Sequence, residues 1–535
     1  MAALAVGCGP LGGCGSAGVP SAAAERPEEG HPFLVEGESE PSSAPEAPAP
    51  PPPPVIVLSD EAHKARSAAQ KAVLGREEHF GEYARELPTL PPPDPALGNL
   101  DALPGSAGGD GGPSAPPLID GDLLGLFVPL ENTEGAPLDH FYRALRRLRS
   151  GDDPDGKVRI LLYGASHTAA DIYPTYLRSY LGERFGDGGP GFVALAKTNK
   201  YYRLLAFELE TSKGWKTEHA QKRESREDGM WGLLGAATSS SKKRDVTRVK
   251  PTGKPSEAPH QTRYDLHFLR QPGGGKFTVA IDGKVVKTVD TKAKAPELGR
   301  FEKTVEGGPH EVEIRPLGKG EVRLYGMTVE NDSKGVVIDT LGINGTRAAN
   351  HLKWDESVWA ESIRRRDPDL YVLAYGTNES LDEDQSIEAY KADLRQVLDR
   401  FKRAAPEASC LLVGPGDFPQ KLDGGTYGPR PRTPALVDAQ RAIALEKGCA
   451  FWDTLAFMGG EGSMVLWAMA EPAMGRSDHI HLTRRGYVRM GMGLTDALMQ
   501  GFEAAERAPA APAVADALGS RAEPAAPAAA AATAP

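Results

Sequence analysis

Four short segments that lie far apart in the chain carry side chains whose types suit the cleavage of an ester. The segments are residues 163–168 (Tyr-Gly-Ala-Ser-His-Thr), 342–346 (Gly-Ile-Asn-Gly-Thr), 375–379 (Tyr-Gly-Thr-Asn-Glu) and 478–481 (Asp-His-Ile-His). Each segment alone is a weak signal. In this order, however, they supply a hydroxyl nucleophile, donors for an oxyanion and an acid–base pair, which are the groups that acyl transfer needs.

Ser166 is the candidate nucleophile, and Asp478 with His481 is the candidate base. A serine hydroxyl becomes a good nucleophile when a base removes its proton. The spacing of three lets the carboxylate fold back on the ring of the histidine, hold the Nδ1 proton and leave Nε2 free for the serine. His479 stands next to the carboxylate and is expected to face elsewhere. The plainer alternatives are a serine that only caps a helix and an Asp-x-x-His pair that only decorates the surface.

Gly345 and Asn378 are candidate oxyanion donors, together with the backbone N–H of Ser166. An asparagine amide can donate to a developing negative charge, and a glycine lets the backbone approach closely. The alternative for both residues is an ordinary place in a turn. Because this set of groups works without a metal or another cofactor, we expect none.

Short apolar runs that alternate with helical patterns surround these segments. The expected strands are 158–163, 336–341, 369–374, 409–413 and 449–452, and the clearest expected helices are 169–184, 387–403, 434–445 and 485–502. Such alternation predicts a parallel sheet with helices on both faces. Three of the candidate segments follow a strand directly, so we expect them at the carboxyl edge of the sheet, where open α/β sheets bind ligands.

Residues 203–335 break this alternation with short runs of period two, and Asp282 and Gly283 between two of the runs are a hairpin signal. This pattern predicts an all-β sandwich inserted between the first and second strands of the α/β domain. The stretch 216–260 within it is polar, and we expect it to form a long, mobile excursion.

Aromatic residues in and near the insert are candidates for stacking on sugar rings. Trp215, Trp231 and Tyr264 belong to the insert, and Tyr201 lies near the expected junction of the two domains. For the three residues of the insert, a place in the sandwich core is the favoured alternative.

The two ends of the chain have compositions that do not support a folded core. Ala, Pro and other small or polar residues dominate there, so residues 1–120 and 504–535 are expected to be disordered, apart from a helix over 60–86. A hydrolase domain is then expected in two parts, 121–202 and 336–503, on either side of the insert. The net charge of −11 argues against nucleic-acid binding, which needs a basic surface.

The chain has four cysteines. Cys410 and Cys449 lie in apolar runs and are expected to pack as small buried hydrophobes, so the folded part should need no disulfide. Cys8 and Cys14 follow short sequences that loosely resemble bacterial lipoprotein cleavage sites. We therefore expect export to the periplasm or cell envelope, with a lipid on an N-terminal cysteine as a candidate membrane tether and the Pro-rich stretch as its spacer.

The chain resembles the SGNH (GDSL-type) hydrolase superfamily at residues that match its four sequence blocks: Ser166, Gly345, Asn378 and the pair Asp478 and His481. The resemblance covers roughly 150–202 and 336–500. It implies a flavodoxin-like, three-layer α/β/α fold and assigns to these residues the catalytic and oxyanion roles given above. The family's usual Gly-Asp-Ser is Gly-Ala-Ser here, with Ala165, and Glu379 stands where the family commonly has Asp.

Within the superfamily, the chain looks most like bacterial peptidoglycan O-acetylesterases, which carry a similar carbohydrate-binding-like β-module and a loop like residues 186–192. This closer resemblance implies the removal of acetyl groups from a cell-envelope glycan. Two alternatives stay open: an O-acetyltransferase that uses the same triad, and a non-catalytic glycan-binding envelope protein. A hydrolase of the Gly-x-Ser-x-Gly elbow type is disfavoured, because Thr168 stands at the second glycine of that motif.

Overall fold

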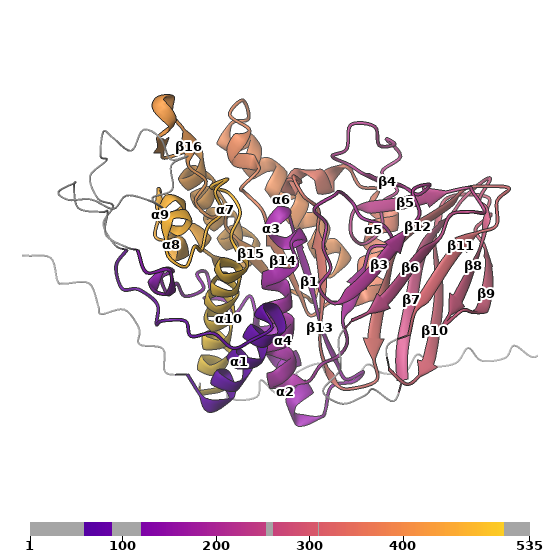
Figure 1. Cartoon of the computed structure of the whole chain (residues 1–535), viewed down its shortest axis with the longest axis horizontal. Helices are drawn as coiled ribbons and strands as arrows, with labels where there is room; N and C mark the ends of the chain where they lie inside the picture. Colours follow the sequence, from indigo (N-terminus) through magenta and orange to yellow (C-terminus); the bar gives the residue numbers. More distant parts are fainter. Residues whose placement is uncertain (1–57, 88–118, 253–260, 309, 508–535) are drawn as a thin grey trace, which may run out of the picture. The chain divides into compact units, whose positions relative to one another are not determined.

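The computed structural model describes residues 58–87, 119–252, 261–308 and 310–507, which form an α/β part and a β-sandwich (Figure 1). Most of the terminal stretches for which disorder was expected lie outside these residues, as do Cys8 and Cys14. Among the described residues, no helix is both long enough and apolar enough to cross a membrane.

Five parallel strands form the central sheet, in the order β13-β1-β14-β15-β18. Their bounds are β1 Lys157–Gly164, β13 Gly335–Gly342, β14 Leu370–Ala374, β15 Ser409–Val413 and β18 Ala450–Trp452. Every residue of β1 and β13 is buried, which is typical of parallel strands covered on both faces. Since β13 and β14 flank β1 on opposite sides, the carboxyl end of β1 is the switch point at which open sheets bind ligands.

Helices cover both faces of this sheet. Along β1, Ile160 and Leu162 face one apolar core and Leu161 and Tyr163 face the other. The first core contains residues of α2 Asp139–Ser150, α4 Ile172–Phe185 and α10 Arg484–Arg507, and the second those of α5 Glu356–Arg366, α6 Ile387–Ala404 and α7 Arg432–Lys447. Shorter helices are η2 Gly121–Leu123, α3 Ser166–Ala169, η3 Ala348–Lys353, η4 Glu379–Leu381, η5 Asp423–Gly425, α8 Thr454–Met458 and α9 Ser463–Met469. The predicted three-layer α/β/α fold is confirmed.

The N-terminal helix is shorter than the predicted 60–86. It is α1 Asp60–Leu74, and Gly75 caps its C-terminus with a φ of 77°, which glycine adopts readily. Arg66 of α1 forms an ion pair with the buried Asp496 of α10. Because α1 also packs on α4, it belongs to the helical layer on that face of the sheet.

The β-sandwich consists of two antiparallel sheets that enclose a separate apolar core. The first has the order β10-β7-β12-β5-β4, with bounds β10 Glu297–Glu306, β7 Gln261–Arg270, β12 Val322–Asn331, β5 Ala236–Ser240 and β4 Lys216–His219. The second has the order β3-β6-β11-β8-β9, with bounds β3 Phe207–Thr211, β6 Thr247–Pro251, β11 Val312–Pro316, β8 Lys276–Ile281 and β9 Lys284–Asp290. A small separate pair is β16 Gln420–Lys421 with β17 Tyr427–Gly428.

Two features of the sandwich differ from expectation. The described part of the polar stretch, 216–252, is not a free excursion, because it contains β4, β5 and β6, each of which pairs with neighbouring strands of the sandwich. The sandwich also extends further toward the N-terminus than residue 203, since β2 Gly191–Val193 pairs with β12. The hairpin at Asp282 and Gly283 is present, with φ of 47° and 77°.

Cys410 and Cys449 are joined by a disulfide, so the expectation of two unpaired thiols is wrong. Cys410 belongs to β15, and Cys449 directly precedes β18, the neighbouring strand. Both residues are buried as predicted. Their apolar surroundings fit a buried free thiol and a buried disulfide equally well. The disulfide forms because the strand order makes β15 and β18 neighbours.

A buried ionic cluster ties the sandwich to the α/β part. Glu330 of β12 forms ion pairs with Arg159 of β1, at 2.9 Å, and with Arg366 of α5. Arg366 also pairs with Asp339 of β13. Burial alone would raise the pKa of Glu330, but the adjacent guanidinium groups hold it well below its usual value. The insert is therefore fixed in part by charge pairing at the amino-terminal end of β1.

Candidate active site

Ser166 stands at the turn between β1 and the short helix α3. Gly164 ends the strand, and a methyl group there would come within 2.1 Å of Thr168 Oγ1 and 2.9 Å of the carbonyl oxygen of Ala374. Gly164 pairs with Gly342 of β13 and with Ala374 of β14. The turn therefore places Ser166 at the carboxyl edge of the sheet, between the ends of two neighbouring strands, as the sequence predicted.

Three side chains form a continuous hydrogen-bonded chain at this edge. His481 Nε2 lies 3.0 Å from Ser166 Oγ, and His481 Nδ1 lies 2.9 Å from Asp478 Oδ2. Because a carboxylate can only accept, the ring proton lies on Nδ1 and the lone pair of Nε2 faces the serine hydroxyl. This is the order of groups that removes a proton from a nucleophilic serine.

Asp478 is held as an ionised acceptor. Its Oδ1 accepts the backbone N–H groups of Ile480, at 3.0 Å, and of His481, at 2.9 Å. Partial burial raises the pKa of Asp478, but these hydrogen bonds and the one to the ring outweigh that effect and leave the pKa below its ordinary value. The carboxylate is therefore charged at neutral pH and can stabilise an imidazolium.

The two predicted oxyanion loops are tied to the same edge. Gly345 has a φ of 77°, a conformation that favours glycine. Asn378 Nδ2 donates one hydrogen to the carbonyl oxygen of Thr346 at 2.9 Å, which fixes the amide and leaves its second hydrogen for a ligand. The N–H of Ile343 donates to the carbonyl of Gly164 at 3.1 Å. The loops after β13 and β14 are thereby bound to one another and to the strand that ends beside the nucleophile.

Glu379 supports these loops from below the surface. It is buried, and its two carboxylate oxygens accept the N–H groups of Ala348, at 2.8 Å, and Gly376, at 3.0 Å. Burial raises its pKa from the ordinary value, and the backbone donors act against that rise. The residue that departs from the family's common Asp therefore has a defined structural place.

His167 is a residue that the sequence reasoning did not select. Its Nδ1 hydrogen-bonds with the hydroxyl of Tyr487 at 3.0 Å, and its ring centroid lies 5.5 Å from that of His481. Burial, followed by the proximity of His481, lowers its pKa to about 3. The ring is therefore uncharged at neutral pH and packs beside the candidate base without competing for its proton. The only feature of the sequence that could have identified His167 as part of the site was its position next to Ser166.

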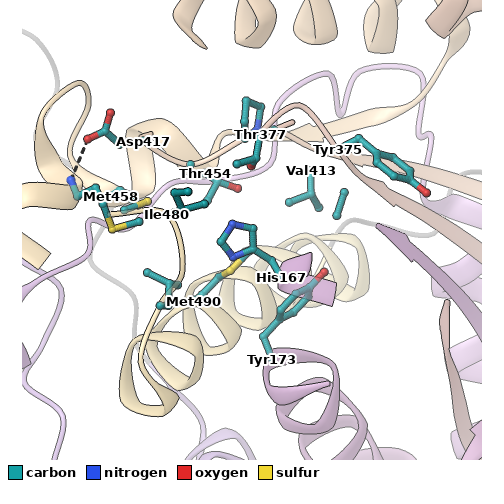
Figure 2. Close-up of a pocket in the computed structure, with 16 residues that line it drawn as sticks. His167, Tyr173, Tyr375, Thr377, Val413, Asp417, Thr454, Met458, Ile480 and Met490 are labelled. Atoms are coloured by element: carbon teal, nitrogen blue, oxygen red, sulfur yellow. Dashed lines mark hydrogen bonds between the residues drawn. The ribbon is translucent and has the colours of Figure 1, made fainter. Parts of the chain in front are cut away.

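A small, mostly apolar cavity of ≈ 30 Å³ lies next to His167 (Figure 2). Val413, Ile480 and Met490 are among its lining residues, and Figure 2 shows the imidazole of His167 directed among them. A space of this size holds about one or two water-sized groups. Asp417 also lines this cavity, where burial raises its pKa to about 6.

The aromatic residues expected to stack on sugars lie mostly in the core. Trp215, Trp231 and Tyr264 are only 9%, 1% and 3% exposed, so none of them offers a ring face to a glycan and that expectation is wrong. The favoured alternative, a core position, holds for all three. Tyr201 is 62% exposed, and its assignment to glycan binding stays a prediction.

Two further residues near the triad have structural contacts. His479 turns away from the serine and stacks on Tyr427, with ring centroids 4.0 Å apart. The backbone N–H of Arg476 donates to the carbonyl of His481 at 2.8 Å. These contacts shape the loop that carries Asp478 and His481.

The chain is similar to known proteins in sequence over part of its length and in fold. Residues 320–489 match the GDSL-like Lipase/Acylhydrolase family, a segment that contains the glycine, asparagine and Asp/His blocks. A solved structure described as "Peptidoglycan O-acetylesterase in action, 5 min" has 22% sequence identity and a TM-score of 0.57, and covers 68% of this chain and 96% of its own. A family two carbohydrate esterase from Cellvibrio japonicus has 13% identity and a TM-score of 0.21, over 56% of this chain and 98% of its own. No curated protein matches in sequence.

Proposed function

Because the chain is an SGNH-type hydrolase, we propose that it is a serine esterase that removes O-acetyl groups from a cell-envelope glycan, with peptidoglycan as the first candidate. The observation that most directly supports esterase activity is the pair of hydrogen bonds in the triad. Ser166 Oγ lies 3.0 Å from His481 Nε2, and His481 Nδ1 lies 2.9 Å from Asp478. This observation is independent of any comparison with other proteins.

In the proposed reaction, His481 takes the proton of Ser166 as Oγ attacks the acetyl carbonyl carbon. Asp478 stabilises the imidazolium, and the N–H groups of Ser166 and Gly345 and the amide of Asn378 hold the oxyanion. The tetrahedral intermediate then collapses, and His481 gives its proton to the sugar oxygen. The sugar alcohol departs, and an acetyl ester remains on Ser166. His481 then takes a proton from water, which attacks that ester, and acetate leaves with the serine reprotonated.

Three observations support an acetylated glycan as the substrate. The β-sandwich packs directly on the domain that carries the triad, which suits a polymer longer than the reacting ester. The small apolar cavity beside His167, the residue next to the nucleophile, has a size that would suit a short acyl group such as acetyl. The structure that shares the fold over both parts of the chain is described as a peptidoglycan O-acetylesterase.

The esterase activity is tested with a chromogenic acetyl ester, for which Ser166→Ala should abolish turnover while the protein keeps its melting temperature. Acetate release from O-acetylated peptidoglycan and from acetylated xylan then ranks the glycans. Full activity of the Ser166→Ala protein would defeat the esterase proposal. Transfer of acetyl to an added glycan acceptor, with little free acetate, would identify a transferase, and glycan binding without any turnover would identify a binding protein.

Export to the periplasm or cell envelope is part of the same proposal. The disulfide between Cys410 and Cys449 supports it, because such bonds persist mainly in oxidising compartments. Cell fractionation with an antibody tests the location. Labelling with a radioactive fatty acid, with and without substitution of Cys8 and Cys14, tests the lipid tether, and unlabelled protein would exclude it.

A further inference from the structure

We propose that Gln221, a residue of the β-sandwich insert, contacts the substrate: its side-chain amide donates a hydrogen bond to an oxygen of the sugar that carries the acyl group. This inference rests on the proposed glycan esterase activity and adds a specificity residue to it. Gln221 lies in the segment that joins β4 to β5, 55 residues after the nucleophile, and carries no sequence signal of its own.

The first step of the argument is that this segment is anchored to the catalytic domain. The hydroxyl of Tyr163, three residues before Ser166, donates to the carbonyl of Leu233 at 2.7 Å. The N–H of Asp355 donates to the carbonyl of Gly229 at 2.7 Å. The segment is therefore held against the carboxyl half of β1 and against the start of α5.

The local turn also has a defined shape. The N–H of Lys222 donates to the carbonyl of His219, and the N–H of Ser225 donates to the carbonyl of Lys222, each at 3.0 Å. The hydroxyl of Ser225 accepts the N–H of His219 at 3.0 Å. These bonds hold Gln221 within a closed turn, so its side chain emerges from a fixed backbone.

The side chain of Gln221 reaches the oxyanion loop. A methyl group built on Gly345 would lie 3.2 Å from Gln221 Nε2, which places this amide nitrogen against the Cα of a candidate oxyanion donor. The Cβ and N–H directions of a residue diverge, so the oxyanion on the N–H of Gly345 lies nearer the backbone than Gln221 does. The reacting carbon also carries the acyl methyl group and the sugar oxygen, and of these two only the sugar offers hydrogen-bond acceptors to an amide.

The amide is not used by the protein itself. Gln221 Oε1 is buried without a hydrogen-bond partner among the described residues, and its Nε2 makes no hydrogen bond to them either. A polar group held beside a reaction centre in this way is costly unless a ligand or water completes its bonds. Sugar hydroxyl, ring and acetamido oxygens are acceptors that suit an amide donor.

The test compares two substrates. In Gln221→Met, which keeps the volume and removes both polar atoms, we expect KM for the acetylated glycan to rise about tenfold, the effect of one lost hydrogen bond. We expect kcat/KM for a small chromogenic acetyl ester, which lacks the sugar, to stay within about twofold of wild type, because Gln221 lies outside the three oxyanion donors. Gln221→Ala should show the same difference between the two substrates. Glu224 is an exposed residue of the same turn, and Glu224→Ala is the matched control, which should change neither measurement.

Each outcome decides the inference. Equal losses on both substrates would show that Gln221 acts on the oxyanion or on the fold, and an unchanged KM for the glycan would show no contact; either result overturns the proposal. Wild-type protein that hydrolyses the small ester but no acetylated glycan would instead defeat the proposed substrate. Failure of the proposed substrate and failure of the Gln221 proposal are distinguishable, because activity of the wild-type protein on the glycan is measured before the variants are compared.

Discussion

Glu379 accepts the N–H of Ala348 at 2.8 Å, and through this bond one buried carboxylate joins the loop after β13 to the loop after β14. Glu379→Ala would leave two buried backbone donors without partners, which costs about 1–3 kcal/mol for each. The loops that present Gly345 and Asn378 would then lose their common support. We expect kcat for an acetyl ester to fall about 10–100-fold, together with a lower melting temperature.

Glu379→Gln and Glu388→Ala complete this comparison. The glutamine retains one acceptor oxygen and should give an intermediate loss, whereas Glu388 is exposed on α6 and should give none. Wild-type kcat in the Glu379→Ala protein would show that the oxyanion loops keep their positions without the carboxylate.

Asp478→Asn tests how the base is oriented. An amide in this position offers a donor as well as an acceptor to Nδ1 of His481, so it no longer fixes the ring proton and cannot balance the charge of an imidazolium. We expect kcat to fall about 10²–10⁴-fold with KM nearly unchanged. Asp384→Asn, at an exposed position, is the control. If Asp478→Asn retained kcat within about twofold of wild type, the carboxylate would have no part in the reaction.

The double substitution of Cys410 and Cys449 by alanine should lower the free energy of unfolding by about 2–4 kcal/mol, because the bond closes a loop of 39 residues in the unfolded chain. Denaturant unfolding of the oxidised protein and the variant measures the difference. Peptide mapping without reduction should recover a linked pair of peptides that contain these residues. Alkylation of both thiols in the native, unreduced protein would contradict the bond.

The positions of the candidate catalytic residues were predictable because they follow from local order along the chain. Buried parallel strands end at one edge of a sheet, so a motif that directly follows each strand must meet the others there. Ser166, Gly345 and Asn378 all obey this rule. His481 and Asp478 needed one further assumption, that a spacing of three closes on itself, and the structure shows this contact.

The features that the sequence did not predict depend on tertiary placement. The pairing of Cys410 with Cys449 requires β15 and β18 to be neighbours, which no local pattern determines. The strands within 216–252 are short and largely polar, and period-two analysis finds only apolar alternation. Gln221 reaches Gly345 only after the insert has docked. Local signals therefore located the catalytic edge but not the insert residue that borders it.

Asp417 gives a prediction for the dependence of stability on pH. Its carboxyl accepts the N–H of Met464 at 2.9 Å, but burial dominates and raises its pKa from 3.8 to about 6. The fold therefore favours the protonated form. The stabilisation that this preference provides is fully present below pH 3.8 and is lost as the pH rises through about 6.

Asp417→Asn should accordingly be more stable than wild type at pH 7 by about 1–3 kcal/mol, and nearly equal to it at pH 4, because the amide is neutral at both values and its oxygen can still accept from Met464. Denaturant unfolding of both proteins at the two pH values measures this double difference, which cancels the titration of all other groups. Asp438→Asn, an exposed substitution on α7, should shift stability little at either pH. A constant difference between wild type and Asp417→Asn at pH 4 and pH 7 would mean that the carboxyl of Asp417 titrates normally in the folded protein.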